Sequence, residues 1–279
     1  MKFAICNELF QEIDFDKVCR KVKKYGYAGV EIAPYTFAKD VRHITPKQRK
    51  EIVATGRKYQ LEIPAIHWLL TTPEGMSITT PNQDRYNFTF NYFKALVDFA
   101  NDIHAGVLVL GSPQQRNIKE EWDRGESEER AINLLREVGY HIQDIESDVI
   151  IAFEPLSPEV TNFGASISAG LDLIERINHT HVKLHIDANA MTTEKDGPNC
   201  LIEKIPKEMI AHVHINEPNR LGPGMETDSS ICGIIIQKLH EMGYSRWVSV
   251  ETFDRNISGD EIAEKSMQYI ENELKTLKK

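Results

Sequence analysis

The stretch Val182-Lys183-Leu184-His185-Ile186-Asp187 is a short apolar run that ends in a carboxylate. Its valine, leucine and isoleucine suit a strand that is buried on both faces of a parallel sheet. Seven further runs of four to seven residues have the same character, and they cover residues 3–6, 28–32, 63–68, 107–111, 149–154, 210–215 and 247–253. The sequence therefore predicts eight buried strands.

Amphipathic patterns with the helical period separate most of these runs, and residues 46–59 and 168–177 are two such predicted helices. Eight strand–helix units in roughly 250 residues are typical of a (β/α)8 barrel. An open doubly wound sheet would more often carry a glycine-rich phosphate turn after its first strand, and the sequence has no G-x-G-x-x-G motif. We therefore expect an α/β fold, a single (β/α)8 TIM barrel domain over residues 1–279.

The charge balance narrows the classes of partner. The 279 residues include 33 Lys or Arg and 42 Asp or Glu, so the formal net charge is −9. Such a surface repels phosphate backbones and anionic lipid, so we expect no nucleic-acid partner and no membrane association. The four scattered cysteines suggest neither a zinc knuckle nor a disulfide framework, and neither a signal peptide nor a membrane span is evident. We expect a cytoplasmic protein.

Four consecutive predicted strands carry a polar residue at or near their carboxyl ends. These residues are Glu154, Asp187, His214 and Glu251, and they follow one another at intervals of 33, 27 and 37 residues. Each interval is about one strand–helix unit, and the carboxyl ends of barrel strands face the active site. We therefore expect the four side chains to converge on one site.

Three carboxylates brought together repel one another unless they are protonated or neutralised. A divalent cation is the simplest neutraliser for three carboxylates and one imidazole, and such oxygen-rich ligation favours Mn²⁺, with Mg²⁺, Co²⁺ and Zn²⁺ as alternatives. The competing interpretation is that each residue forms a separate ion pair at its strand end. The regular order of all four along the chain favours one divalent metal ion.

The sequence around these residues resembles a known family. The segments 153–155, 184–187, 212–220 and 250–253 are similar to those of the xylose isomerase-like TIM-barrel superfamily of sugar and sugar-phosphate isomerases and epimerases. The resemblance covers nearly the whole chain and is closest to the branch that holds ketose 3-epimerases and hydroxypyruvate isomerases. It implies one Mn²⁺, Mg²⁺ or Co²⁺ ion.

The resemblance also implies a role for each matching residue. Glu154, Asp187, His214 and Glu251 would bind the metal ion. Glu154 and Glu251 would in addition be the catalytic acid and base.

The motif His-x-His-x-x-Glu, followed by an arginine, implies that Glu217 and Arg220 face the substrate. The epimerase branch usually has a histidine where this chain has Ala190, and a glutamate expected after the fifth strand falls on Val160, beside Glu159. The identity of the substrate therefore does not follow from the resemblance.

Further substrate-binding candidates are His67, Trp68, Arg116 and His185. His67 and Trp68 would contact a sugar or pack in the core. The planar guanidinium of Arg116 would clamp a phosphate or carboxylate, or form an ion pair in a loop. His185 shares a strand face with Asp187 and would support the metal site.

Two more polar residues belong to predicted strands. Glu31 would bind a hydroxyl group or brace the mouth of the barrel. His212 is expected to be a buried histidine with its hydrogen bonds satisfied.

Two aromatic residues suggest a possible contact between copies of the chain. Phe88 and Phe90 would serve a homo-oligomer or pack within the barrel.

These features predict a metal-dependent isomerase or epimerase for a sugar or sugar phosphate. A divalent ion on a carbonyl and its neighbouring hydroxyl acidifies the shared C–H, so one carboxylate removes the proton through an enediolate and another group returns one. A dehydratase or lyase on a keto-sugar, and a non-catalytic sugar-binding or accessory barrel, are the alternatives. An abasic-site endonuclease needs a DNA-binding surface, which the net charge disfavours.

Overall fold

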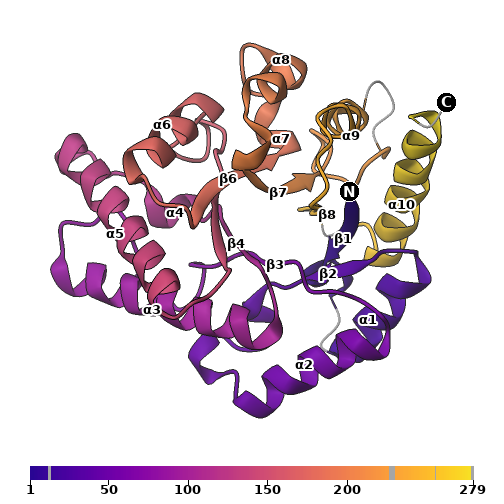
Figure 1. Ribbon diagram of the computed structural model, residues 1–279, viewed down its shortest axis with the longest axis horizontal. Coiled ribbons are helices and arrows are strands. Elements are labelled where there is room, and N and C mark those ends of the chain that lie inside the picture. The colour runs from indigo at the N-terminus through magenta and orange to yellow at the C-terminus, as the bar shows by residue number, and fades with distance from the viewer. Residues whose placement is uncertain (12–13, 226–229, 255, 278–279) are drawn as a thin grey trace. The chain divides into compact units, whose positions relative to one another are not determined.

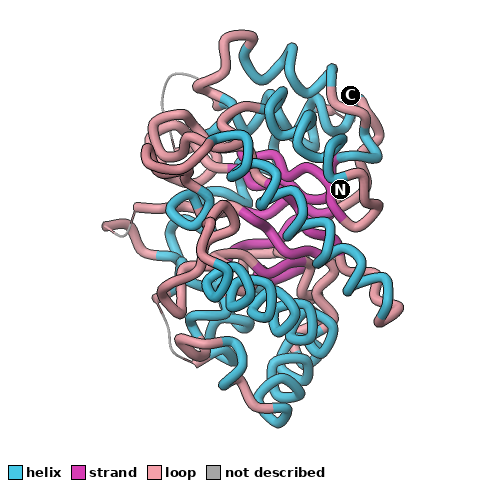
Figure 2. Tube along the Cα trace, turned by 90° about the vertical axis from the view of Figure 1, so that its left-hand side faces the viewer, coloured by secondary structure: helices cyan, strands magenta, loops and turns pink. Residues whose placement is uncertain are grey.

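The structure of the protein is a computed structural model that describes residues 1–11, 14–225, 230–254 and 256–277. Short strands alternate with longer helices along these residues (Figure 2). The strands are β1 (Lys2–Cys6), β2 (Gly29–Glu31), β3 (Ala65–Ile66), β4 (Val107–Leu110), β5 (Ile150–Phe153), β6 (Val182–Asp187), β7 (Ile210–Ile215) and β8 (Trp247–Val250).

The α-helices follow the strands in the order that the sequence predicts. They are α1 (Phe15–Lys24), α2 (Pro46–Lys58), α3 (Gln83–Ile103), α4 (Pro113–Arg116), α5 (Arg124–Asp144), α6 (Ile167–Ile177), α7 (Ala188–Met191), α8 (Gly197–Lys204), α9 (Ile231–Glu241) and α10 (Gly259–Thr276). Helices α2 and α6 begin within one residue of their predicted starts, whereas the short helix α4 lies where no helix is expected.

Polar residues before the helices explain where several helices begin. The side chains of Asn82, Asp123, Ser166 and Ser258 each accept a hydrogen bond from a backbone N–H of the first turn of α3, α5, α6 and α10. Such N-cap residues satisfy donors that have no partner inside the helix.

The sheet has the strand order β2-β1-β8-β7-β6-β5-β4-β3 among the described residues. The chain divides into two compact units that interleave in the sequence. Unit 1 comprises residues 1–32, 51–64 and 186–279, and unit 2 comprises residues 33–50 and 65–185.

Unit 1 contains β1, β2, β7 and β8, and its strand pairs are parallel. Strand β1 pairs with β2 and with β8, and the register sets Cys6 beside Glu31. Strand β7 pairs with β8, so that His214 lies beside Ser249. Polar residues thus occur on three strands of this unit: Glu31 on β2, His214 on β7 and Ser249 on β8.

Unit 2 contains β3, β4, β5 and the part of β6 up to His185. Strand β4 pairs in parallel with β3 and β5, and β5 pairs with β6. The long helices α3 and α5 run beside each other in this unit (Figure 1). On α3, Phe88 and Phe90 are half-buried, and the Arg42 guanidinium covers the Phe88 ring at 5.4 Å.

Two strands are shorter than the sequence predicts by three residues or more. Strand β3 ends at Ile66, because Trp68 has a φ of 55°, in the left-handed region that no strand continues through. Strand β8 ends at Val250, so Glu251 lies directly after the strand rather than within it. Trp68 and Glu251 therefore lie just beyond the carboxyl ends of β3 and β8.

No helix within the described ranges is both long enough and apolar enough to cross a bilayer.

Candidate active site

Three of the predicted metal ligands lie together in unit 1. Asp187 is the last residue of β6, His214 lies in β7, and Glu251 follows β8. One ligand atom of each side chain lies within 4.8 Å of the others. All three residues are at least 95% buried, with exposed fractions of 5%, 1% and 5%. The structure therefore gathers two carboxylates and an imidazole from three separate strands.

Hydrogen bonds fix the carboxylate of Asp187. Its Oδ1 accepts from the backbone N–H of Ala190 at 2.8 Å, and its Oδ2 accepts from Asn216 Nδ2 at 2.9 Å. Burial raises the pKa of Asp187 to about 6, and the nearby charge of Glu251 adds to the shift. A cation bound beside this carboxylate would oppose the shift and favour its ionised form.

His214 lies between two carboxylates. Its Nδ1 is 2.9 Å from Glu251 Oε2, and its Nε2 is 2.9 Å from Glu31 Oε1. Burial alone would lower the pKa of His214, but the negative charges of Glu31 and Glu251 outweigh it and raise the pKa well above its usual value. The surroundings of His214 therefore stabilise a positive charge.

Glu31 is fully buried and bridges two histidines of β7. Its Oε2 accepts a hydrogen bond from His212 Nε2 at 2.7 Å, and Ser249 Oγ lies 3.1 Å from the same nitrogen. Burial would raise the pKa of Glu31, but His214 and His212 hold it well below its usual value. His212 is the buried, hydrogen-bonded histidine that the sequence predicts, and Glu31 braces the strand ends.

The donor set in unit 1 fits a divalent cation. Carboxylate oxygens with one imidazole nitrogen are ligands for Mn²⁺, Mg²⁺, Co²⁺ or Zn²⁺. Atoms that bind one such ion at about 2.0–2.3 Å lie roughly 3–4.5 Å from one another. The ligand atoms of Asp187, His214 and Glu251 lie within 4.8 Å of one another, which is close to this spacing.

Glu154, the fourth predicted ligand, directly follows β5 in unit 2. Its backbone N–H donates to Leu110 O at 3.1 Å, which continues the pairing with β4. The carboxylate lies against the bare backbone of Gly111, because a Cβ there would collide with Glu154 Oε2. Val160, at the position where a glutamate is expected, is 45% exposed.

The side chain of Arg116 is buried beneath Glu154 and is only 1% exposed. Its Nη1 donates to the backbone carbonyl of Glu154 at 2.6 Å, and the guanidinium lies 4.9 Å above the Phe153 ring. Burial lowers the pKa of Arg116 to about 10, and the charge of Glu154 opposes the shift. The second terminal nitrogen, Nη2, is buried and has no hydrogen-bond partner within the described residues.

Three more predicted substrate-binding residues lie at strand ends of unit 2. His67 follows β3 and is 1% exposed, and His185 is fully buried in β6. Trp68 is half-buried, and its ring packs edge-on against Tyr35 with the ring centres 6.3 Å apart. Each stays a predicted substrate contact.

Glu217 and Arg220 lie in the loop after β7. Glu217 is fully buried, and its Oε1 accepts hydrogen bonds from Gly224 N at 2.8 Å and Ser230 Oγ at 2.5 Å. Arg220 is exposed, and its backbone carbonyl accepts from Phe253 N at 3.1 Å. Glu217 therefore binds this loop through Oε1, and Arg220 is exposed. Both residues stay predicted substrate contacts.

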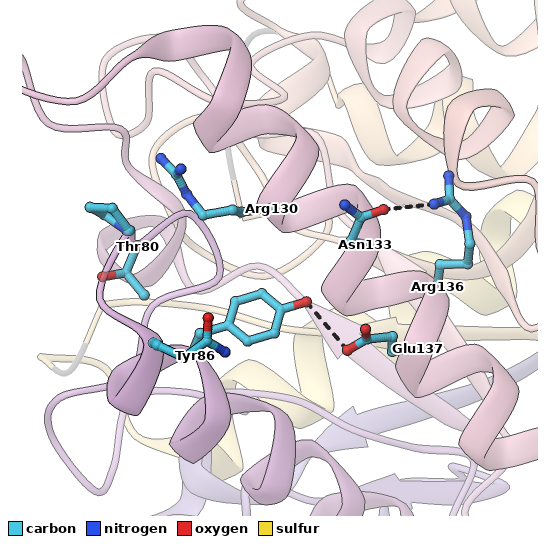
Figure 3. A pocket seen from close by; sticks show the side chains of 8 residues that line it. Thr80, Tyr86, Arg130, Asn133, Arg136 and Glu137 are labelled. Atoms are coloured by element: carbon cyan, nitrogen blue, oxygen red, sulfur yellow. Dashed lines mark hydrogen bonds between the residues drawn. The ribbon is translucent and has the colours of Figure 1, made fainter.

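A pocket of about 420 Å³ lies elsewhere in unit 2, between α3 and α5 (Figure 3). Its lining includes Arg130 and Arg136, but both guanidinium groups already donate to backbone carbonyl oxygens. Tyr86 donates to Glu137 across the pocket at 3.3 Å. No predicted site residue lines it, so we do not assign the active site to this pocket.

Sequence reasoning missed two residues that the site uses. Asn216 binds the carboxylate of Asp187, and Ser249 contacts His212. Asn216 follows β7 immediately, so its position at a strand end was the available signal. Ser249 is an ordinary strand residue in the sequence, and only its register beside His214 reveals it.

Two relatives that are similar in sequence carry the names of sugar epimerases. The probable ketose 3-epimerase of Synechocystis sp. is 25% identical over 85% of this chain and 78% of its own. The D-psicose 3-epimerase of Enterocloster bolteae is 27% identical over 86% of this chain and 77% of its own. Epimerases are isomerases, so the relatives confirm the predicted enzyme class.

A solved structure shows the same fold. The D-psicose 3-epimerase of Clostridium cellulolyticum H10, determined with D-tagatose, superposes with a TM-score of 0.80 at 18% identity and covers 99% of both chains. A family model described as xylose isomerase-like TIM barrel matches residues 19–273. The predicted TIM barrel fold is thereby confirmed, and the chain belongs to the xylose isomerase-like TIM barrel family.

Proposed function

We propose that this protein is a divalent-metal-dependent epimerase or isomerase of a ketose or ketose phosphate. The observation that carries the proposal is the buried cluster of Asp187, His214 and Glu251 at the carboxyl ends of three strands. The epimerase names of the two relatives supply the substrate class.

The metal site would use four residues of this chain. Asp187, His214 and Glu251 supply three ligands, and Glu154, at the end of the preceding strand β5, supplies the fourth. A bound divalent ion would polarise a carbonyl and its neighbouring hydroxyl and so acidify the C–H that they share. We propose Mn²⁺ as the ion, because the donors are mainly oxygen.

Glu154 and Glu251 would move the proton. One carboxylate takes the proton from the C–H next to the carbonyl, which leaves an enediolate, and the other returns a proton. Return to the opposite face of the same carbon gives the epimer, whereas return to the neighbouring carbon gives an isomer. We propose that the two carboxylates act from opposite sides of the bound substrate.

The remaining predicted residues would bind and orient the sugar. His67 and Trp68 offer an imidazole and an aromatic face, and His185 a second imidazole. The free Nη2 of Arg116 can donate to a substrate oxygen, and the exposed Arg220 suits a hydroxyl or phosphate.

The proposed setting is the cytoplasm. The cysteines Cys6, Cys19 and Cys232 are buried and free, which suits a reducing compartment.

Solvent exchange at carbon tests the function directly. Chelator-stripped protein is reloaded with Mn²⁺ and incubated in deuterated water with a panel of ketoses and ketose phosphates, and deuterium at each carbon is measured by NMR. We expect deuterium at C3 with formation of the C3 epimer of at least one sugar, and neither in the Glu251→Gln variant. Loss of water from the sugar would instead indicate a lyase, and no exchange with any ketose would contradict the proposal.

A further inference from the structure

Glu31 is a buried carboxylate to which the proposed chemistry gives no contact with substrate. It ends β2 and is fully buried. Each of its two oxygens faces a different histidine of β7, with Oε1 2.9 Å from His214 Nε2 and Oε2 2.7 Å from His212 Nε2. A buried carboxylate is costly unless it is paired and hydrogen-bonded, so these two contacts hold Glu31 in one orientation.

The two ring nitrogens of His214 have different surroundings. Nδ1 faces Glu251, whose carboxylate belongs with Asp187 to the proposed metal ligands. Nε2 faces Glu31, whose second oxygen is already occupied by His212. An ionised carboxylate only accepts hydrogen bonds, so without an ion each contact requires a proton on the ring nitrogen that makes it. Metal binding would displace the proton of Nδ1, and the contact with Glu31 would keep the proton of Nε2.

We propose that Glu31 is a positioning residue for the metal site: it keeps the proton of His214 on Nε2 and so leaves Nδ1 to bind the ion. This inference rests on the proposed function. A carboxylate behind a ligating imidazole fixes the tautomer and ring orientation and makes the imidazole a stronger base. His212 anchors Glu31 in turn, and Ser249 contacts the same nitrogen of His212.

A competing arrangement uses the same atoms. Ligand atoms of Glu31, His212 and His214 also lie within 4.8 Å of one another, so this trio could itself hold an ion. His214 would then bind through Nε2 instead of Nδ1. The identity of the coordinating nitrogen separates the two arrangements.

The first test measures the affinity for Mn²⁺ alone by calorimetry, on chelator-stripped protein. We expect the Glu31→Gln variant to bind one Mn²⁺ per chain about 10- to 100-fold more weakly than the wild type. The matched control Glu62→Gln changes an exposed carboxylate of the same unit that pairs with Lys2, and it should stay within about threefold of the wild type. Equal affinity of Glu31→Gln and the wild type overturns the role of Glu31 while leaving the metal site intact.

The second test locates the ring proton of His214 in the wild-type protein. Long-range ¹H–¹⁵N NMR on Zn²⁺-loaded protein, with His214 assigned through a His214→Gln variant, locates the ring proton. We expect the proton on Nε2 and the metal-shifted resonance on Nδ1. A proton on Nδ1 overturns the inference, and a wild-type protein that binds neither Mn²⁺ nor Zn²⁺ overturns the metal site together with it.

Discussion

At the scale of single residues, Arg116 has the largest fully buried side chain in the described structure. Its Nη1 donates to the backbone carbonyl of Glu154 at 2.6 Å. The side chain of Glu154 is a proposed metal ligand and proton carrier. We expect Arg116→Met to lower kcat about 10- to 100-fold, because small displacements of catalytic groups have effects of this size. The lost charged hydrogen bond should also lower the free energy of unfolding by about 1.5–3 kcal/mol.

Steady-state kinetics and urea unfolding measure the two effects of Arg116→Met. Arg124→Met is the matched control, because Arg124 also donates to a backbone carbonyl, that of Asn162, but is exposed. The control should keep its kcat. An Arg116→Met enzyme that loses stability but keeps kcat would show that Arg116 does not position Glu154.

The sequence was enough to predict the types of residue at the candidate site, but not the directions in which their side chains point. Glu154, Asp187, His214 and Glu251 stand at or beside strand ends, so the strand pattern alone located them. Arg116 is the last residue of the short helix α4, which follows β4. Only the packed structure shows that its guanidinium points toward the backbone of Glu154.

At the scale of elements, Gly111 directly after β4 leaves room for the side chain of Glu154. A Cβ at residue 111 would collide with Oε2 of Glu154. We expect Gly111→Ala to lower kcat by at least about tenfold, because the extra methyl group displaces this carboxylate. The overpacking should reduce the unfolding free energy by about 1–3 kcal/mol.

Gly125→Ala is the control for Gly111→Ala in kinetics and thermal unfolding. Gly125 lies in α5, where an added Cβ meets only Asp123 Oδ1 at an ordinary 3.4 Å. Alanine favours a helix over glycine by up to about 1 kcal/mol, so this variant should keep its activity and its stability. Unchanged kcat in Gly111→Ala would mean that Glu154 needs no fixed position.

The 3-10 helix η3 (Val41–His43) of unit 2 should show a pH-dependent stability. Asp40 caps it and binds Arg42 through two carboxylate oxygens, and the hydrogen bonds from the Arg42 side chain lower the pKa of Asp40. A lowered pKa stabilises the fold above the unfolded-state value near 4, and the effect disappears as the pH falls through the folded-state value.

We expect Asp40→Asn to be less stable than the wild type at pH 7 and to approach it below about pH 4. Asparagine still caps a helix, so this variant removes the charge alone, whereas Asp40→Ala should lose a further ~1 kcal/mol for the cap. Urea unfolding from pH 3 to pH 7 measures both differences. A gap between wild type and Asp40→Asn that does not shrink at low pH would contradict this account.

The alternation of strands and helices was largely readable from the sequence, because buried parallel strands are apolar runs and the helices are amphipathic. The ends were less predictable. The positive φ of Trp68 ends β3 early, and this depends on the packing of the following loop rather than on hydropathy. The four-residue helix α4 is too short to show a helical period.

At the scale of the whole molecule, the proposed ion should stabilise the fold. A ligand that binds only the folded protein at 100 times its Kd adds about 2.7 kcal/mol to the unfolding free energy. We therefore expect Mn²⁺ to raise the melting temperature of chelator-stripped protein, and excess EDTA to reverse the increase. Asp187→Asn should show no such shift, and an equal shift in that variant would place the ion elsewhere.

The family could be inferred from the sequence because the order of Glu154, Asp187, His214 and Glu251 is tied to the order of strands in the barrel. The substrate could not, because Ala190 and Val160 replace polar residues of the resembling branch. The backbone N–H of Ala190 binds Asp187, and this uses none of its side chain.

Metal content is the measurement that tests the central claim most directly. Elemental mass spectrometry is performed on protein purified without chelators, with the His214→Ala variant alongside and circular dichroism to confirm that both are folded. The account predicts about one divalent ion per wild-type chain and its loss in the variant. A wild-type protein that holds no ion even after reloading with Mn²⁺, or a folded variant that retains the ion, would contradict it.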